Sequence, residues 1–575
     1  MLKLIRFLKP YSFYVAATLA LLFFQSLSEL YLPTLMSDIV DIGILNGDIK
    51  YILGVGMIML LVAAVGSVCT ILAGFLSSRT AAGLGKNIRS EVFARAESFS
   101  LSEFDRVGTA SLITRTTNDI TQVQQMSIMM LRIIISAPMM CIGGIVMAVS
   151  KDPGLSLVIV VAIPILAGAI FFITGRGIPL FRVMQKKLDS LNRVLREGLT
   201  GIRVIRAFNR VDYERRRFDR ASLDLASTAI SANRIMASLM PAMMLLLNLT
   251  IISIIWFGGI RIDSGKMQIG DLMAFIQYVM QIMFSLIMVS MVLIMIPRAS
   301  ASAARINEVL DIEPEIRDPD RPEAGGGKRG GISFENVTFS YPGAEEPAVS
   351  NISFSARPGE VTAIIGGTGS GKSTLINLIM RFYDVDSGRV LIDGVDVRRM
   401  SQKSLRSKIG FVPQRAVLFT GTIADNVRFG KEDAGDDEVA GALEIAQAEE
   451  FVSAMKEGVC SLLGQGGANL SGGQKQRLSI ARALVGRPEI YVFDDSFSAL
   501  DFKTDARLRE ALKRETAGAT VIIVAQRVST IMDADSIIVL NEGRIAGTGT
   551  HQTLMKDCEV YREVVFSQLS EEETA

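Results

Sequence analysis

Six long apolar stretches alternate with polar connections over the first half of the chain. Each stretch is long enough to cross a hydrocarbon core of about 30 Å as a helix. Charged residues are rare inside them, which favours helices over barrel strands. The pattern predicts an all-α membrane domain whose six spans lie near Tyr11–Thr34, Tyr51–Ser77, Met129–Ser150, Leu155–Ile173, Ile235–Ile260 and Leu272–Ile296.

Basic residues gather on one side of the predicted membrane. The connections after the second and fourth spans are long, and the later one is rich in arginine between Arg193 and Arg220. The N-terminus adds Lys3, Arg6 and Lys9. By the positive-inside rule, the N-terminus, both long connections and the C-terminal half face the cytoplasm.

Helical periodicity continues beyond the fourth span. Apolar residues recur at steps of three or four from Leu188 to Ile205, with arginines between them. We therefore expect the spans to continue as helices into the cytoplasm. Arg132 is a basic residue inside the third span. Two interpretations stay open: a side chain facing a water-filled cavity, or one reaching from a helix end to the interface.

The character of the chain changes after Ile296. Residues 298–311 read as a polar helix, and the next stretch is rich in Pro, Gly and charged residues. Alternating strand and helix patterns begin at Ile332 and indicate a soluble α/β domain. The predicted organisation is a membrane domain at 1–310, a linker at 311–330 and an α/β P-loop domain at 331–575.

Composition argues against two kinds of function, nucleic-acid binding and a cysteine-based metal site. The 575 residues carry a formal net charge of +1, which gives no support to nucleic-acid binding. Four cysteines lack the spacing of a metal site, and His551 is the one histidine of the sequence.

A glycine-rich turn after an apolar strand carries the first chemical signal. It fits G-x-x-x-x-G-K-S between a strand and a helix, the pattern of a phosphate-binding loop. Backbone N–H groups and the helix N-terminus cradle phosphates, the lysine meets the β- and γ-phosphates, and the serine binds Mg²⁺. The nucleotide-binding candidates are Gly366, Gly367, Thr368, Gly369, Ser370, Gly371, Lys372, Ser373 and Thr374.

A second apolar strand, 489–493, ends at Asp494. A carboxylate there suits Mg²⁺ beside bound phosphates, so ATP and Mg²⁺ are the expected cofactors. Between the two strands lies Leu470 followed by Ser471, Gly472, Gly473 and Gln474. This LSGGQ sequence resembles the signature of the ATP-binding cassette (ABC) family, in its exporter branch with six fused spans.

The resemblance implies roles for further residues. Two cassettes stack head to tail, so each ATP lies between one phosphate loop and the other cassette's signature. Tyr341 resembles the aromatic residue that stacks on adenine, and Gln414 the residue that contacts Mg²⁺ with Ser373 and Asp494. Residues 498–501 resemble a loop that communicates across the dimer. The two long cytoplasmic connections would dock on cassettes through tips near 101–105 and 207–212.

Three positions depart from the family pattern, all at or near the nucleotide. Asp495 stands where the catalytic glutamate is usual, Gln526 where the switch histidine is usual, and Gln465 replaces a glutamate before the signature. The groups that bind ATP are thus intact, while those that position water are altered. We expect tight ATP binding and slow hydrolysis at this chain's own site.

The resulting hypothesis is one half of a heterodimeric exporter in a bacterial inner or plasma membrane. A second ABC half-transporter would supply the competent catalytic residues, and the substrate would be amphiphilic: a drug, lipid or peptide. The alternatives are a slow homodimer, a regulatory or channel-like ATP-gated subunit, and import through the same architecture.

Overall fold

The computed structural model describes residues 2–323 and 330–568, which form two compact units. The first contains Met1–Glu97 and Thr109–Ile312, and the second Ser98–Gly108 and Glu313–Ala575. Part of the predicted linker 311–330 belongs to the second unit, and its residues 324–329 lie outside the described part. The limits 310 and 331 remain a prediction.

The first unit is helical. Within the described residues, six helical segments are long and apolar enough to span a membrane, which confirms the predicted number. Its elements are η1 (Leu2–Tyr11), α1 (Ser12–Asp38), the π-helix η2 (Ile39–Ile44), α2 (Ile49–Glu97), α4 (Thr109–Thr114), the π-helix η3 (Arg115–Asp119), α5 (Ile120–Lys151), α6 (Leu157–Thr200), α7 (Ile202–Ala207), α8 (Val211–Ala237), α9 (Leu239–Asp263) and α10 (Ile269–Asp311).

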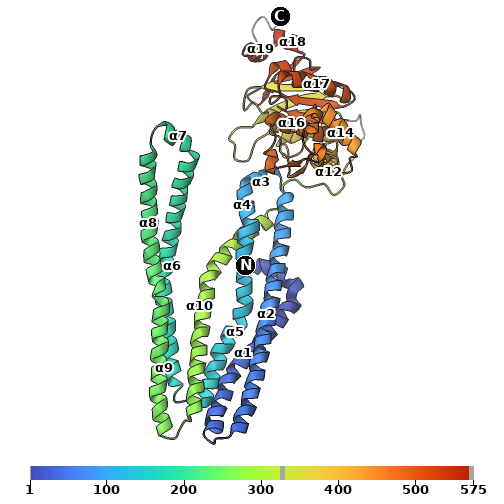
Figure 1. Ribbon diagram of the computed structural model, residues 1–575. Helices are drawn as coiled ribbons and strands as arrows, with labels where there is room; N and C mark the ends of the chain where they lie inside the picture. The colour runs from blue at the N-terminus through green and yellow to red at the C-terminus, as the bar shows by residue number, and fades with distance from the viewer. Residues whose placement is uncertain (1, 324–329, 569–575) are drawn as a thin grey trace. The chain divides into compact units, whose positions relative to one another are not determined.

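Two groups of helices are visible in this unit (Figure 1). Helix α1 packs against α2 and α5, with α10 along α5, whereas α6 runs beside α8 and α9. Phe275 and Tyr278 on α10 are fully buried in the apolar core that joins these helices, together with Ile254 of α9. The Tyr278 hydroxyl lies 2.6 Å from Thr34 Oγ1, so this buried phenol has a polar partner.

Buried carboxylates hold the short connections between spans. Asp152 is 2% exposed, pairs with Arg261 and accepts a hydrogen bond from the Leu155 N–H at 2.8 Å. Asp41 accepts one from the Gly270 N–H at 2.6 Å. A Cβ on Gly270 would lie 2.6 Å from Asp41 Oδ2, so a side chain at this position would break the contact. These carboxylates fix three short connections to one another.

Helices extend well beyond the apolar stretches, as the periodicity predicts. Helix α2 continues to Glu97 and α6 to Thr200. The periodic segment 188–205 is not one continuous helix, however, because Gly201 separates α6 from α7. Glycine costs about 1 kcal/mol relative to alanine inside a helix, which favours the break at this position.

The second unit contains a mixed six-stranded sheet in the order β12-β11-β3-β10-β9-β6, a four-stranded sheet in the order β2-β1-β4-β5, and the pair β7-β8. The strands are β1 (Ile332–Phe339), β2 (Val349–Ala356), β3 (Val361–Gly366), β4 (Ser387–Ile392), β5 (Val395–Asp396), β6 (Ile409–Val412), β7 (Gly421–Thr422), β8 (Leu462–Leu463), β9 (Ile490–Asp494), β10 (Thr520–Val524), β11 (Ser536–Asn541) and β12 (Arg544–Gly549).

Helices alternate with these strands along the chain, which confirms the predicted α/β class. They are α3 (Leu101–Val107), α11 (Lys372–Ile379), α12 (Gln402–Ser407), α13 (Ile423–Arg428), α14 (Asp436–Ile445), α15 (Glu449–Ser453), α16 (Gly472–Leu484), α17 (Phe502–Glu515), α18 (His551–Asp557) and α19 (Glu559–Phe566). Strands β3 and β9 are both parallel to β10, which lies between them. Val524 of β10 pairs with both Ile364 and Asp494, so the carboxyl ends of β3 and β9 meet at one edge. In open α/β sheets this edge is where ligands bind.

Candidate functional site

The Gly366–Thr374 segment runs from the last residue of β3, through the turn 367–371, into the first three residues of α11. Gly371 has φ +97°, and a Cβ there would lie 2.6 Å from Val349 Cγ1. A Cβ on Gly366 would collide with the carbonyl oxygen of Leu540. Only glycine fits both positions, and the chain then enters α11 with its first N–H groups free to bind an anion.

Lys372 is the first residue of α11, and its ammonium folds back over the turn. Its Nζ donates hydrogen bonds to the carbonyl oxygens of Gly366 at 2.9 Å and Gly367 at 2.7 Å. Burial lowers the pKa of this lysine, while the charges of Asp494 and Asp495 oppose that shift. The cation is therefore partly desolvated beside the loop, where a phosphate would gain most from it.

Asp494 lies across β10 from this loop. Burial raises the pKa of its carboxyl group, with a further rise from Asp495, while the hydrogen bond from Ser373 and the charge of Lys372 lower it. The hydroxyl of Ser373 and the carboxylate of Asp494 are thus neighbours. Mg²⁺ prefers a few oxygen ligands of this kind together with phosphate and water, so this pair suits it.

Tyr341 follows β1 and belongs to an aromatic cluster. Its ring meets Phe339 and Tyr383 edge-on, with centroids 5.0 and 5.3 Å away. Its hydroxyl lies 3.1 Å from Thr374 Oγ1, which ties the ring to the phosphate loop. This contact places Tyr341 beside α11, within the same site as the loop glycines.

Gln414 and Asp495 are hydrogen-bonded to each other, whereas among the described residues the side chain of Gln526 forms no hydrogen bond with either. Gln414 Nε2 donates to Asp495 Oδ2 at 3.3 Å. Asp495 has φ +46°, and its N–H donates to the carbonyl of Val524. Gln526 is exposed, and its main-chain carbonyl accepts a hydrogen bond from Gln568. The structure therefore joins Gln414 and Asp495 at the strand edge, beside Asp494.

The Ser471–Gln474 segment begins helix α16. Ser471 Oγ accepts a hydrogen bond from the Gln474 N–H at 3.3 Å, and Gln474 Oε1 accepts one from the Ser471 N–H at 2.9 Å. This reciprocal pair is a capping box, which fixes the helix start. A Cβ on Gly473 would lie 3.1 Å from the carbonyl oxygen of Ala499, so the segment packs against the 498–501 loop. Gly472 has open space around it.

The signature segment and the phosphate loop are separate features of one cassette. In the part of the chain that the structure describes, no hydrogen bond or ion pair joins Ser471–Gln474 to Gly366–Thr374.

Comparison with known proteins identifies this arrangement. Residues 15–286 match the ABC transporter transmembrane region and residues 349–498 match the ABC transporter domain. An ABC transporter ATP-binding protein of Mycobacterium tuberculosis is 45% identical over 565 residues, which cover 98% of this chain and 97% of that protein. The chain belongs to the ABC transporter family.

Two further similarities indicate which kind of ABC transporter this chain is. A fatty acid ABC transporter ATP-binding/permease protein of Mycobacterium bovis is 34% identical over 475 residues, covering 82% of this chain and 75% of that protein. The structure of a bacterial Atm1-family ABC exporter with ATP bound matches with a TM-score of 0.81 and 28% identity, covering 97% of this chain and 98% of that chain. This integral membrane protein is thus an ABC exporter with an ATP-hydrolysing cassette, and ABC exporters function as dimers.

The sequence does not indicate which residues the tip of the first cytoplasmic connection contacts. Helix α3 forms that tip and belongs to the same compact unit as the cassette. Glu103 is 3% exposed, and its Oε1 accepts a hydrogen bond from the Glu315 N–H at 2.8 Å. Burial, followed by contact with Asp105, raises the pKa of Tyr383 to about 12. The readable signal was Ser100-x-x-Glu103, a capping box that predicts a helix start.

Proposed function

We propose that this chain is one half of a heterodimeric exporter that moves an amphiphilic molecule out of the cytoplasm. It binds ATP at Gly366–Thr374 and Tyr341, with Mg²⁺ held by Ser373, Gln414 and Asp494. It hydrolyses that ATP slowly, while Ser471–Gln474 completes the site on the partner's phosphate loop. The proposal rests mainly on Asp495. This shorter carboxylate stands where the family usually has the catalytic glutamate.

Geometry supports slow hydrolysis at this site. An aspartate is one methylene shorter than a glutamate, which moves the carboxylate back by about 1.5 Å. A misplacement of about 1 Å can lower a rate by roughly 10²-fold. Asp495 also accepts a hydrogen bond from Gln414, which occupies one of the carboxylate oxygens that would otherwise orient water. Gln526 stands where the γ-phosphate-sensing histidine is usual, so the imidazole is replaced by a neutral amide.

An amphiphilic substrate agrees with the membrane unit and with one relative. Met280, Met288 and Met295 line a cavity in that unit. Flexible thioether side chains adapt to apolar molecules of irregular shape. The Mycobacterium bovis relative is named a fatty acid transporter. Membrane lipid is a further expected partner, because the apolar helices lie in the bilayer.

The decisive experiment is co-purification with the product of a neighbouring gene that encodes a second half-transporter carrying the missing glutamate and histidine. We expect a complex of the two chains whose ATPase activity rises with amphiphilic compounds. A rapidly hydrolysing assembly of this chain alone would contradict the heterodimer. ATP-gated ionic currents without ATP-driven transport would instead favour the channel alternative.

Nucleotide binding is expected to depend on Lys372. Lys372→Ala should weaken ATP binding at this site by about tenfold or more, because it removes a charged donor to the phosphates. Lys403→Ala, an exposed lysine on α12, is the matched control and should leave binding unchanged. Binding is measured at subsaturating ATP, and equal occupancy of the two variants would refute the assignment.

Topology can be tested with single cysteines after the four native ones are replaced. Asn46→Cys, in an exposed turn between the first two spans, should react with an impermeant thiol reagent on intact cells. Arg210→Cys, exposed before α8, should react only after permeabilisation. Asp152 is unsuitable because it is buried against Arg261. Labelling of position 210 on intact cells would overturn the proposed cytoplasmic orientation.

A further inference from the structure

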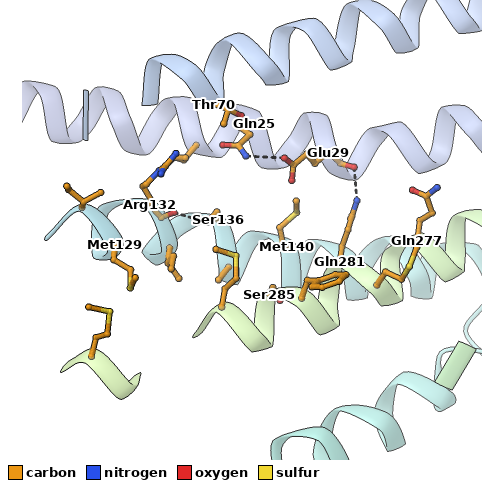
Figure 2. A pocket seen from close by; sticks show the side chains of 18 of the residues that line it. Gln25, Glu29, Thr70, Met129, Arg132, Ser136, Met140, Gln277, Gln281 and Ser285 are labelled. Atoms are coloured by element: carbon orange, nitrogen blue, oxygen red, sulfur yellow. Dashed lines mark hydrogen bonds between the residues drawn. The ribbon is translucent and has the colours of Figure 1, made fainter. Parts of the chain in front are cut away.

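A cavity of about 890 Å³ lies among α1, α2, α5 and α10 of the first compact unit. Figure 2 shows polar side chains on more than one wall, with Gln25 and Glu29 on α1 and Arg132 on α5. Met129 and Met140 contribute apolar surface. A volume of this size suits a molecule with both an apolar body and a polar head.

The Glu29 carboxylate has a neutral hydrogen-bond partner and, among the described residues, no ion pair. Gln25 Nε2 donates to Glu29 Oε1 at 3.0 Å, and Gln281 Nε2 donates to the Glu29 carbonyl at 3.1 Å. Both amide nitrogens are thereby assigned as donors, and the two amide oxygens are buried without a donor. The Glu29 side is therefore a fixed network anchored on α1.

The guanidinium of Arg132 lacks such a network. Among the described residues, it has no ion-pair partner and no hydrogen-bond acceptor. Its Nη2 lies beside Gly74 of α2, 3.4 Å from where a Cβ would stand. Arg132 is in the interior of α5, twelve positions after its first residue Ile120, and faces the cavity. Because Arg132 lines the cavity, the structure favours the interpretation of an arginine that faces a cavity.

An arginine remains charged, so this one needs an anion or water within the membrane unit. We propose that the cavity binds an acidic amphiphile whose carboxylate or phosphate pairs with Arg132 and whose apolar chain lies against the methionines. This inference rests on the proposed export of an amphiphile and names its charge. A planar guanidinium can take either anion through two parallel hydrogen bonds.

The test compares four radiolabelled probes with the same alkyl chain: dodecanoate, dodecyl phosphate, dodecanol and dodecylamine. Their equilibrium binding is measured without nucleotide, on the assembled protein in lipid nanodiscs. The two anions should bind more tightly than dodecanol and dodecylamine. Arg132→Gln should weaken binding of the preferred anion by about tenfold or more and change dodecanol binding little. The stronger of the two anions then identifies a carboxylate or a phosphate headgroup.

Two variants separate a specific contact from a general disturbance. Arg132→Lys keeps the charge but not the two parallel donors, so it should restore part of the anion preference. Arg176→Gln is the matched control, because Arg176 lies over the Phe172 ring on α6, away from this cavity. It should bind all four probes as the unmodified protein does.

Each other outcome has a definite meaning. No preference for anions, or equal losses for dodecanoate and dodecanol in Arg132→Gln, would overturn the inference. Because nucleotide is absent, such a failure leaves the proposed ATP-driven export intact. Anion binding that depends on Arg132, without ATP-dependent translocation of any probe, would count against the proposed function instead.

Discussion

Replacement of Ser471 by alanine is expected to lower ATP turnover of the assembled transporter by about 10²-fold or more, the range for losing one donor to developing charge. Ser471 is the N-cap residue of α16, and we propose that its hydroxyl and the first N–H groups of the helix bind the γ-phosphate of the partner's ATP. In the proposed dimer this site completes the partner's competent nucleotide site. The measurement is steady-state ATPase activity of the reconstituted heterodimer at saturating ATP.

A loss of helix capping has to be separated from a loss of phosphate contact. Ser471 Oγ caps α16, and removing such a cap costs about 1 kcal/mol of stability. Ser471→Asn keeps a capping side chain, yet should be as inactive as Ser471→Ala. Ser401→Ala removes a similar cap from α12 and should change turnover by less than about twofold. Recovery of activity in Ser471→Asn would assign the effect to capping alone.

The number of spans was predictable because membrane helices must be apolar over a fixed length. What each helix does beyond that length was harder to predict. Helix α2 continues past Ser77, with Leu84, Ile88 and Val92 buried at steps of four. The break at Gly201 was missed because the apolar period continues across it, and only the single glycine marks the interruption.

The phosphate loop and Asp494 could be proposed from short sequences, since a strand, a tight turn and a helix start determine the local geometry. Contacts between distant segments could not. Glu103 and Glu315 meet across 212 residues, and no local pattern connects them. The same limit hid the cavity: Arg132 stood out as a charge among apolar residues, but only helix packing shows that Glu29 shares its cavity without pairing with it.

The second large expected effect is a difference in ATP turnover between matched substitutions at the two nucleotide sites, and it follows from the shorter carboxylate of Asp495. Replacing the glutamate that the partner chain supplies with glutamine should lower turnover of the heterodimer by 10²-fold or more, as expected for loss of a positioned general base. Asp495→Asn in this chain should change turnover by less than about threefold, because a carboxylate set back by about 1.5 Å positions water poorly.

Asparagine is the cleanest probe at position 495. The backbone there has φ +46°, a conformation that asparagine and aspartate adopt more readily than most residues. The side chain keeps its shape and can still accept a hydrogen bond from Gln414, so the charge alone is removed. Turnover that collapses in Asp495→Asn would show that this site is catalytic. If turnover persists in Asp495→Asn while the partner's glutamine variant is inactive, hydrolysis occurs mainly at the site that Ser471 completes. The same heterodimer then explains both a severe defect on replacing Ser471 and a mild effect on replacing Asp495.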